Sequence, residues 1–96
     1  MPDKSVRWLR LALQDLHDLM QHLEANADKA TAEDIAGRIW KAGQSLNHLS
    51  SRGRPGKVPN TRELVLNKAP YYLSYRVCEN EVQILRIIHF ARHYPR

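Results

Sequence analysis

The chain has 96 residues and a mass of 11.2 kDa, so we expect one domain over residues 1–96 with a thin core. Hydrophobic residues make up 43% and charged residues 26%, which argues against a disordered chain. No apolar run approaches the roughly 20 residues of a membrane span, no secretory signal is visible, and the single Cys78 cannot form an internal disulfide. These features argue against a membrane protein, a disulfide scaffold and a multi-domain enzyme, and they predict a cytoplasmic protein.

The formal net charge of +5 is unevenly distributed along the chain. Residues 1–51 hold six Lys or Arg and seven Asp or Glu, whereas residues 52–96 hold nine and three. Nearly all of the basic excess therefore lies in the C-terminal half, and most of it is arginine. This asymmetry suggests an anionic partner, either nucleic acid or an acidic protein segment, but a solvated basic surface explains it equally well.

The first half of the chain predicts a short strand and two helices. Residues 5–8 can form a strand that leads into an amphipathic helix with apolar residues at helical spacing. The interruption at residues 26–28 ends this helix, and a second amphipathic helix follows with Asp28 or Thr31 as its N-cap. Two such helices joined by a short link form a hairpin whose apolar stripes need a surface to cover them.

A loop at residues 50–60 separates the helices from the C-terminal part of the chain. It contains two Gly, two Pro and three cations, and no helix or central strand tolerates so many breakers. Gly53 suits a left-handed backbone position just past a helix end.

Three strand patterns come after the loop, at residues 61–66, 71–77 and 82–90. The last is apolar on both faces except at Arg86 and His89, which is typical of a central strand. The predicted order is therefore β-α-α-β-β-β. We expect an α+β fold in which the helical hairpin packs on one face of a three- to four-stranded antiparallel sheet. The N-terminal strand would join an edge, and Arg and His side chains would occupy the opposite face.

Three motifs succeed one another in the C-terminal half: GRPGKVPNTRELV at residues 53–65, APYYLSYRV at 69–77 and VQILRIIHFARHYP at 82–95. In this order and spacing they resemble the RelE/ParE superfamily of bacterial toxin–antitoxin pairs, and the resemblance covers nearly the whole chain. It implies a cognate antitoxin that wraps the toxin with a C-terminal segment. On physical grounds we expect this segment to be an acidic, partly disordered chain that folds on the helical hairpin and the sheet edge. We expect no cofactor, no metal, no membrane and no small-molecule substrate.

The superfamily has two main activities, so membership alone does not decide the function. The RelE-like branch cleaves mRNA in the ribosome, whereas the ParE-like branch inhibits DNA gyrase by binding. Nuclease members place basic residues on the strand after the loop and an Arg after the aromatic residue that opens the next strand. The corresponding positions here hold Glu63, Val65 and Tyr72, which offer no fixed positive charge to a scissile phosphate. The resemblance therefore favours a gyrase-binding toxin that is not an enzyme.

A ribosome-dependent mRNA endonuclease is the alternative function. His89, Arg92 and Tyr94 lie near the positions at which some nuclease members keep a His, an Arg and a Tyr. In this alternative the partners are the ribosome and mRNA, and these three residues are catalytic.

The residues predicted to bind the antitoxin or the target are Arg62, Arg76, Arg86, His89, Arg92 and Tyr94. The first three can share a sheet face, unless they pair with the glutamates near them in sequence. The basic segment 86–96 is the expected contact with gyrase. His89 and His93 have the spacing of a metal pair on a helix, but they come after a strand and no carboxylate or Cys lies near them in sequence, so no metal site is predicted.

Overall fold

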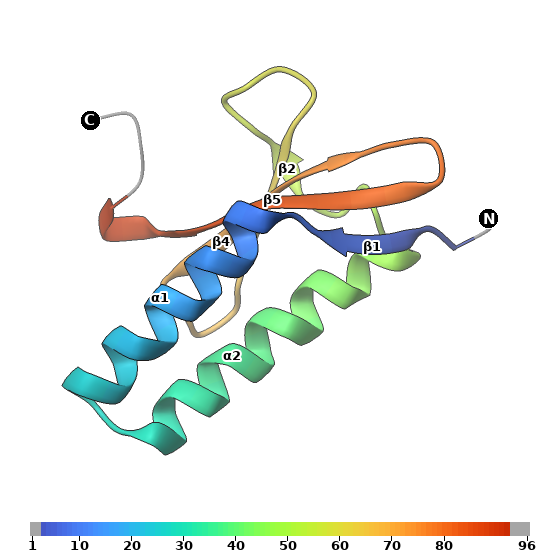
Figure 1. Cartoon of the computed structure of the whole chain (residues 1–96). Helices are drawn as coiled ribbons and strands as arrows, with labels where there is room; N and C mark the ends of the chain where they lie inside the picture. Colours follow the sequence, from blue (N-terminus) through green and yellow to red (C-terminus); the bar gives the residue numbers. More distant parts are fainter. Residues whose placement is uncertain (1–2, 93–96) are drawn as a thin grey trace.

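A computed structural model describes residues 3–92 of the chain, and these form a mixed sheet with two helices on one side of it (Figure 1). The elements in chain order are β1 (Ser5–Trp8), α1 (Arg10–Asn26), α2 (Lys29–Gln44), the 3-10 turn η1 (Ser45–Asn47), β2 (Arg54–Pro55), β3 (Arg62–Val65), β4 (Tyr71–Val77), β5 (Glu81–His89) and the 3-10 turn η2 (Phe90–Arg92).

The sheet has five strands in the order β1-β5-β4-β3-β2. The predicted count of three to four strands was wrong, because Arg54 and Pro55 form a two-residue strand inside the segment predicted to be a loop. This strand lies at the edge of the sheet, the position where a Pro without an N–H costs no ladder hydrogen bond. The α+β class, the element order and the N-terminal strand at an edge are confirmed.

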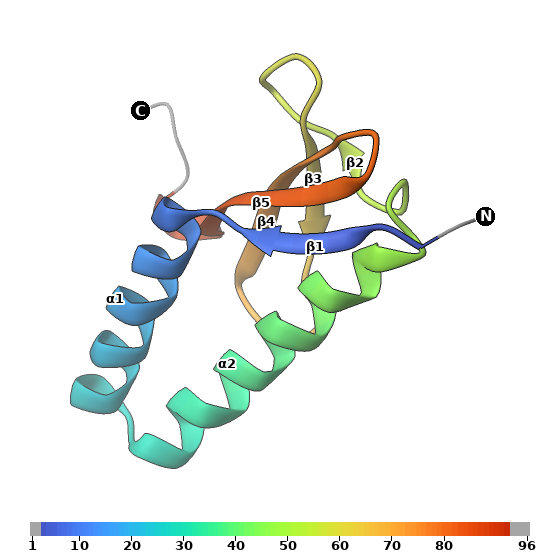
Figure 2. The ribbon, with the colours of Figure 1, turned by 45° about the vertical axis from the view of Figure 1, so that its right-hand side comes forward.

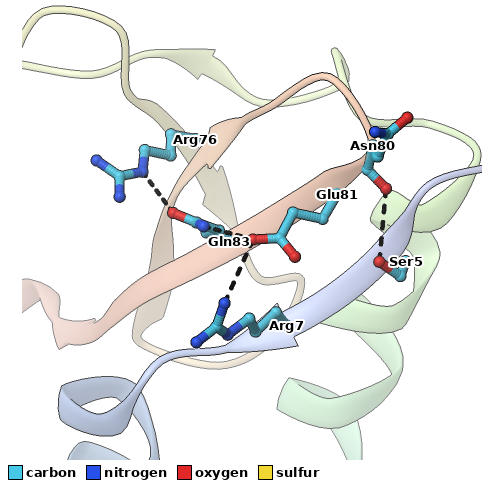
Figure 3. Close-up of polar contacts among 6 residues, drawn as sticks. All are labelled: Ser5, Arg7, Arg76, Asn80, Glu81 and Gln83. Carbon is cyan, nitrogen blue, oxygen red and sulfur yellow. Dashed lines mark hydrogen bonds and ion pairs between the residues drawn. The ribbon is translucent and has the colours of Figure 1, made fainter.

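The N-terminal strand runs parallel to β5, so the sheet is mixed and the prediction of a purely antiparallel sheet was wrong. The register extends from Ser5 opposite Glu81 to Trp8 opposite Ile84. At the start of the pair, the Ser5 hydroxyl donates to the Asn80 carbonyl oxygen over 3.5 Å (Figure 3). The direction of a four-residue strand depends on a partner about 75 residues away, which the strand's own pattern does not encode.

Both helices lie on the same side of the sheet, as a hairpin that diverges from it toward the α1–α2 connection (Figure 2). Their apolar residues pack on the inward-facing residues of β3, β4 and β5, which forms the predicted core between hairpin and sheet. Asp28 is the N-cap of α2, and its carboxylate accepts a hydrogen bond from the Thr31 N–H over 2.7 Å. This bond holds the pKa of Asp28 below its usual value.

A β-bulge divides β5 into two parts. Ser74 lies opposite Arg86, but the next residue, Tyr75, lies opposite Ile84, so Leu85 is the extra residue. The bulge lets both Ile84 and Ile87 face the core, although strict alternation would put them on opposite faces.

The loop at residues 50–60 is fastened to the sheet through Tyr75. The Tyr75 hydroxyl donates to the Ser50 carbonyl oxygen (2.8 Å) and accepts from the Gly53 N–H (2.9 Å). Gly53 does not adopt the predicted left-handed backbone. It is required for space instead, since a Cβ there would lie 2.6 Å from the Tyr75 hydroxyl.

Candidate interaction surface

A chain of polar side chains crosses the sheet face that lies opposite the helices, here called the open face (Figure 3). Arg76 on β4 donates from Nε to Gln83 Oε1 on β5 over 2.6 Å, and Gln83 Nε2 donates to Glu81 Oε2. The same Glu81 oxygen lies 3.8 Å from a guanidinium nitrogen of Arg7 on β1. This row of polar side chains has an exposed guanidinium group at each end, that of Arg76 on β4 and that of Arg7 on β1. The open face is therefore suited to an anionic partner.

The three arginines predicted to share a face do not all do so. The register puts Arg76 and Arg86 on the open face, in line with Ser74. Arg62 lies opposite Tyr75 and therefore on the other face. Its guanidinium donates to the carbonyl oxygen of Gly53 over 2.6 Å, so it fastens the loop at residues 50–60.

Arg86 is engaged by a carboxylate from α1. Its Nε and a terminal nitrogen lie 2.8 and 3.0 Å from the two carboxylate oxygens of Asp15. The sequence offered the glutamates near the three arginines as alternative partners. For Arg86 the carboxylate comes from Asp15 instead, because the helix start after Trp8 brings α1 alongside the second half of β5.

The three positions that would carry nuclease cations lie together on the open face but form a neutral, partly apolar surface. Glu63 pairs with Arg54 over 2.9 Å, so its charge is compensated. Val65 is 42% exposed and lies opposite Tyr72, whose buried ring contacts the ring of Phe90 at 5.1 Å. Burial, with the nearby Glu63 carboxylate, raises the pKa of Tyr72 above its usual value, so this phenol is neutral at physiological pH.

His89 lies on the helix side of the sheet, opposite Tyr71, and not on the open face where it was expected. Its Nδ1 accepts from the Ala91 N–H over 2.9 Å, which places any ring proton on Nε2. The structure therefore does not bring His89 together with Glu63, Val65 and Tyr72. Arg92 ends η2, and its side chain, like the whole of Tyr94, lies outside the described part of the chain.

A cleft of about 680 Å³ opens between the helical hairpin and the end of the sheet. One wall consists of the α1 stripe Asp15, Asp18 and His22, and His89 lies on the opposite wall. The motifs of the sequence did not point to this stripe. Its spacing of three and four residues was a usable indication, because such residues share one face of a helix. The motifs did not point to Gln83 either. Its usable indication was that it is a polar residue in an otherwise apolar strand.

The structure also bears on metal binding and on membrane insertion. Between residues 3 and 92, no three His, Cys, Asp or Glu side chains are grouped so that they could hold a metal ion. Within the same range, neither helix is long and apolar enough to cross a membrane.

Comparison with known proteins identifies the family of this chain. Residues 6–94 match the family described as the ParE toxin of the type II toxin–antitoxin system parDE. A curated protein of Sinorhizobium fredii (strain NBRC 101917 / NGR234) named "Putative toxin Y4kP" is 35% identical over 96 residues, which is 100% of this chain and 98% of that protein.

The chain is also similar to solved structures of toxin–antitoxin systems. The chromosomal ParDE system of P. aeruginosa matches with a TM-score of 0.86 and 30% identity, covering 93% of this chain and 98% of the matched chain. The RelBE2 toxin–antitoxin complex of Mycobacterium tuberculosis matches with a TM-score of 0.67 over 93% of each chain, but at 23% identity this likeness concerns the fold alone.

The chain is thus a small α+β toxin of the RelE/ParE superfamily, the toxin component of a toxin–antitoxin system. Within that superfamily it belongs to the ParE toxin family.

Proposed function

We propose that this toxin acts by binding DNA gyrase and not by cleaving mRNA, and that a cognate antitoxin neutralises it. The observation that carries this proposal is the replacement of the expected nuclease cations. On the open face, Glu63 is already paired with Arg54, Val65 is apolar, and Tyr72 is a buried neutral phenol. Fixed positive charge stabilises a pentacoordinate phosphate, and the side chains at these three positions supply none.

The target surface in this proposal is the basic part of the open face together with the segment after β5. Arg76 is exposed and held by Gln83, so its guanidinium is pre-positioned for an anionic group of a partner. Arg62 and Arg86 act mainly inside the molecule, through the Gly53 carbonyl and the Asp15 carboxylate. Among the sequence-predicted residues, Arg76 and Arg92 are therefore the ones we assign to target binding.

The second candidate function is the mRNA endonuclease, favoured only by His89, Arg92 and Tyr94. It predicts cleavage at the ribosomal A site that His89→Ala or Tyr94→Phe abolishes. The position of His89 on the helix side of the sheet, away from Tyr72, argues against a shared nuclease centre on the open face.

The test measures two reactions with one toxin preparation: plasmid supercoiling by gyrase, and cleavage of mRNA on translating ribosomes. We expect inhibition of supercoiling that the antitoxin relieves, and intact mRNA. Cut mRNA with unimpaired supercoiling would replace the proposal by the second candidate.

A further inference from the structure

The outer face of α2, defined here by Glu33, Gly37, Trp40 and Lys41, is separate from the open face and from the cleft. All four residues are exposed. Their spacing of three and four residues places them on one side of the helix. The other side of α2 carries its buried residues, Ala32, Ile39 and Gly43. The described chain packs α2 by that buried side, which leaves the outer face to another molecule.

Gly37 lies in the interior of α2, where a glycine is less favourable than an alanine. The other glycine of this helix, Gly43, has a reason within the chain, because a Cβ there would lie 2.3 Å from the Trp8 ring. At Gly37, in contrast, a Cβ would meet no described atom within 4 Å beyond the backbone of the helix itself. The packing of the chain on itself therefore does not explain Gly37, whereas the close approach of a second backbone would.

A large aromatic side chain lies beside Gly37, one turn further along α2. Trp40 stacks on Trp8 of β1, with ring centroids 5.2 Å apart and an interplanar angle of 10°. Trp8 Nε1 donates to Gln44 Oε1 over 3.0 Å, which holds the inner ring of the stack. Trp40 is nevertheless 49% exposed. A held but half-exposed indole is the kind of apolar anchor that protein interfaces bury.

The charges of the outer face are complementary to those of a second, inverted copy. Glu33 comes four residues before Gly37, and Lys41 comes four residues after it. In an antiparallel pair of α2 helices with the two-fold axis at Gly37, Glu33 of each copy lies opposite Lys41 of the other. Within residues 3–92 neither of these two side chains forms an ion pair, whereas the neighbouring Asp34 and Arg38 pair with each other over 2.9 Å. Glu33 and Lys41 are therefore both available to the second copy.

We propose that the outer face of α2 binds a second copy of this chain, in a two-fold symmetric dimer whose α2 helices run antiparallel and cross at Gly37. The missing side chain at Gly37 lets the helices approach, and the Trp40 rings are buried beside the crossing point. Two Glu33–Lys41 ion pairs select the antiparallel direction. This inference goes beyond the proposed function and does not depend on the target. Each copy keeps its open face and its cleft for other partners.

The experiment exchanges the two charges of the outer face. Full-length toxin, freed of antitoxin, is studied by sedimentation equilibrium from about 1 to about 200 μM, with circular dichroism to confirm folding. We expect a monomer–dimer equilibrium for the wild type. Glu33→Lys and Lys41→Glu each oppose like charges and should raise the dissociation constant about tenfold or more, whereas Glu24→Lys, exposed on α1, should change it less than about twofold. The double variant that carries both exchanges should dimerise again, and an equimolar mixture of the two single variants should form a mixed dimer.

A steric variant tests the crossing point independently of charge. Gly37→Gln adds a side chain where the described chain leaves space, and it replaces glycine by a better helix former. The variant should therefore be at least as resistant to thermal unfolding as the wild type, but it should be monomeric. A dimer as tight as that of the wild type would overturn the close approach at Gly37.

The remaining outcomes also decide the proposal. A folded wild type that is monomeric at about 200 μM would overturn it. A double variant that dimerises no better than the single variants would overturn the antiparallel pairing. If the wild type is monomeric and Lys41→Glu weakens binding of the antitoxin or of gyrase, the outer face belongs to that partner and the proposal is wrong. A dimer that does not inhibit gyrase would refute the proposed function and still support the dimer, so the two failures are distinguishable.

Discussion

Arg86 on β5 binds both carboxylate oxygens of Asp15 on α1, at 2.8 and 3.0 Å, although 71 residues separate them in sequence. The same carboxylate accepts the Ile87 N–H over 2.9 Å, so one side chain serves both a guanidinium and a strand edge. The carboxylate is only 15% exposed. The contact fastens α1 to β5 beyond the end of β1. It also engages the Arg86 guanidinium within the molecule, so this group is less available to a partner.

Removal of the Asp15 carboxylate should therefore lower the free energy of unfolding. We expect Asp15→Ala to lower the free energy of unfolding by about 2 kcal/mol, because it removes an acceptor that the Arg86 guanidinium and the Ile87 N–H share. Asp15→Asn keeps an acceptor for Ile87 and should lose about half as much. Urea unfolding, read from the midpoint at constant slope, measures both changes. Asp15→Ala with a wild-type midpoint would show that the contact contributes nothing.

The loop at residues 50–60 should loosen when the Tyr75 hydroxyl is removed. Tyr75→Phe leaves the Ser50 carbonyl and the Gly53 N–H without this partner, which should cost about 1–3 kcal/mol. Amide exchange at Gly53 should accelerate accordingly. Tyr72→Phe is the control, since the described contact of Tyr72 with Phe90 is made by the rings. Equal protection of Gly53 in both variants would contradict the anchoring role.

The same tyrosine predicts a dependence of stability on alkaline pH. Burial raises the pKa of the Tyr75 hydroxyl above its usual value of about 10, and the hydrogen bond from Gly53 only partly opposes this. As the pH rises, the Tyr75 hydroxyl therefore loses its proton at a lower pH in the unfolded chain than in the folded protein. The contribution of Tyr75 is thus complete below about pH 10 and is lost as the pH rises through the folded-state pKa. The stability difference between wild-type and Tyr75→Phe should therefore narrow between about pH 8 and about pH 11, in urea unfolding at each pH. A constant difference would contradict this linkage.

Target binding should depend on Arg76, an exposed cation of the open face, and on Arg92 of the segment after β5. We expect the double variant Arg76→Glu, Arg92→Glu to weaken gyrase inhibition by about tenfold or more, because negative charges then replace the two cations that we assign to an anionic partner surface. Arg38→Glu makes the same change on α2, away from the sheet, and should leave inhibition within about twofold. The assignment of these residues fails if the double variant retains both its toxicity and its antitoxin binding.

The local patterns of the sequence predicted the elements well, because each helix and long strand carries its own periodicity. The alternating residues of the predicted strand at 71–77, for example, put Leu73 and Tyr75 on one face of β4, and both are buried in the core. What local patterns could not show depends on contacts between distant segments. The parallel direction of β1 is set by β5, and the strand at Arg54 and Pro55 exists only because β3 lies beside it.

The candidate site was less predictable than the fold, for the same physical reason. A one-residue bulge at Leu85 changes which face each later residue of β5 occupies, so the faces of Arg86 and His89 could not be derived from alternation. The pairing of Arg86 with Asp15 needed the position of α1 relative to the sheet. The loss of nuclease cations at Glu63 and Tyr72, in contrast, could be read from the motifs directly.

A titration of gyrase distinguishes a toxin that acts by binding from one that acts by turnover. Supercoiling of a relaxed plasmid is measured at a fixed gyrase concentration while the wild-type toxin is increased. We expect inhibition that depends on the ratio of toxin to gyrase and is reversed by an equimolar amount of antitoxin. Full supercoiling at a large excess of folded, antitoxin-binding toxin would contradict it.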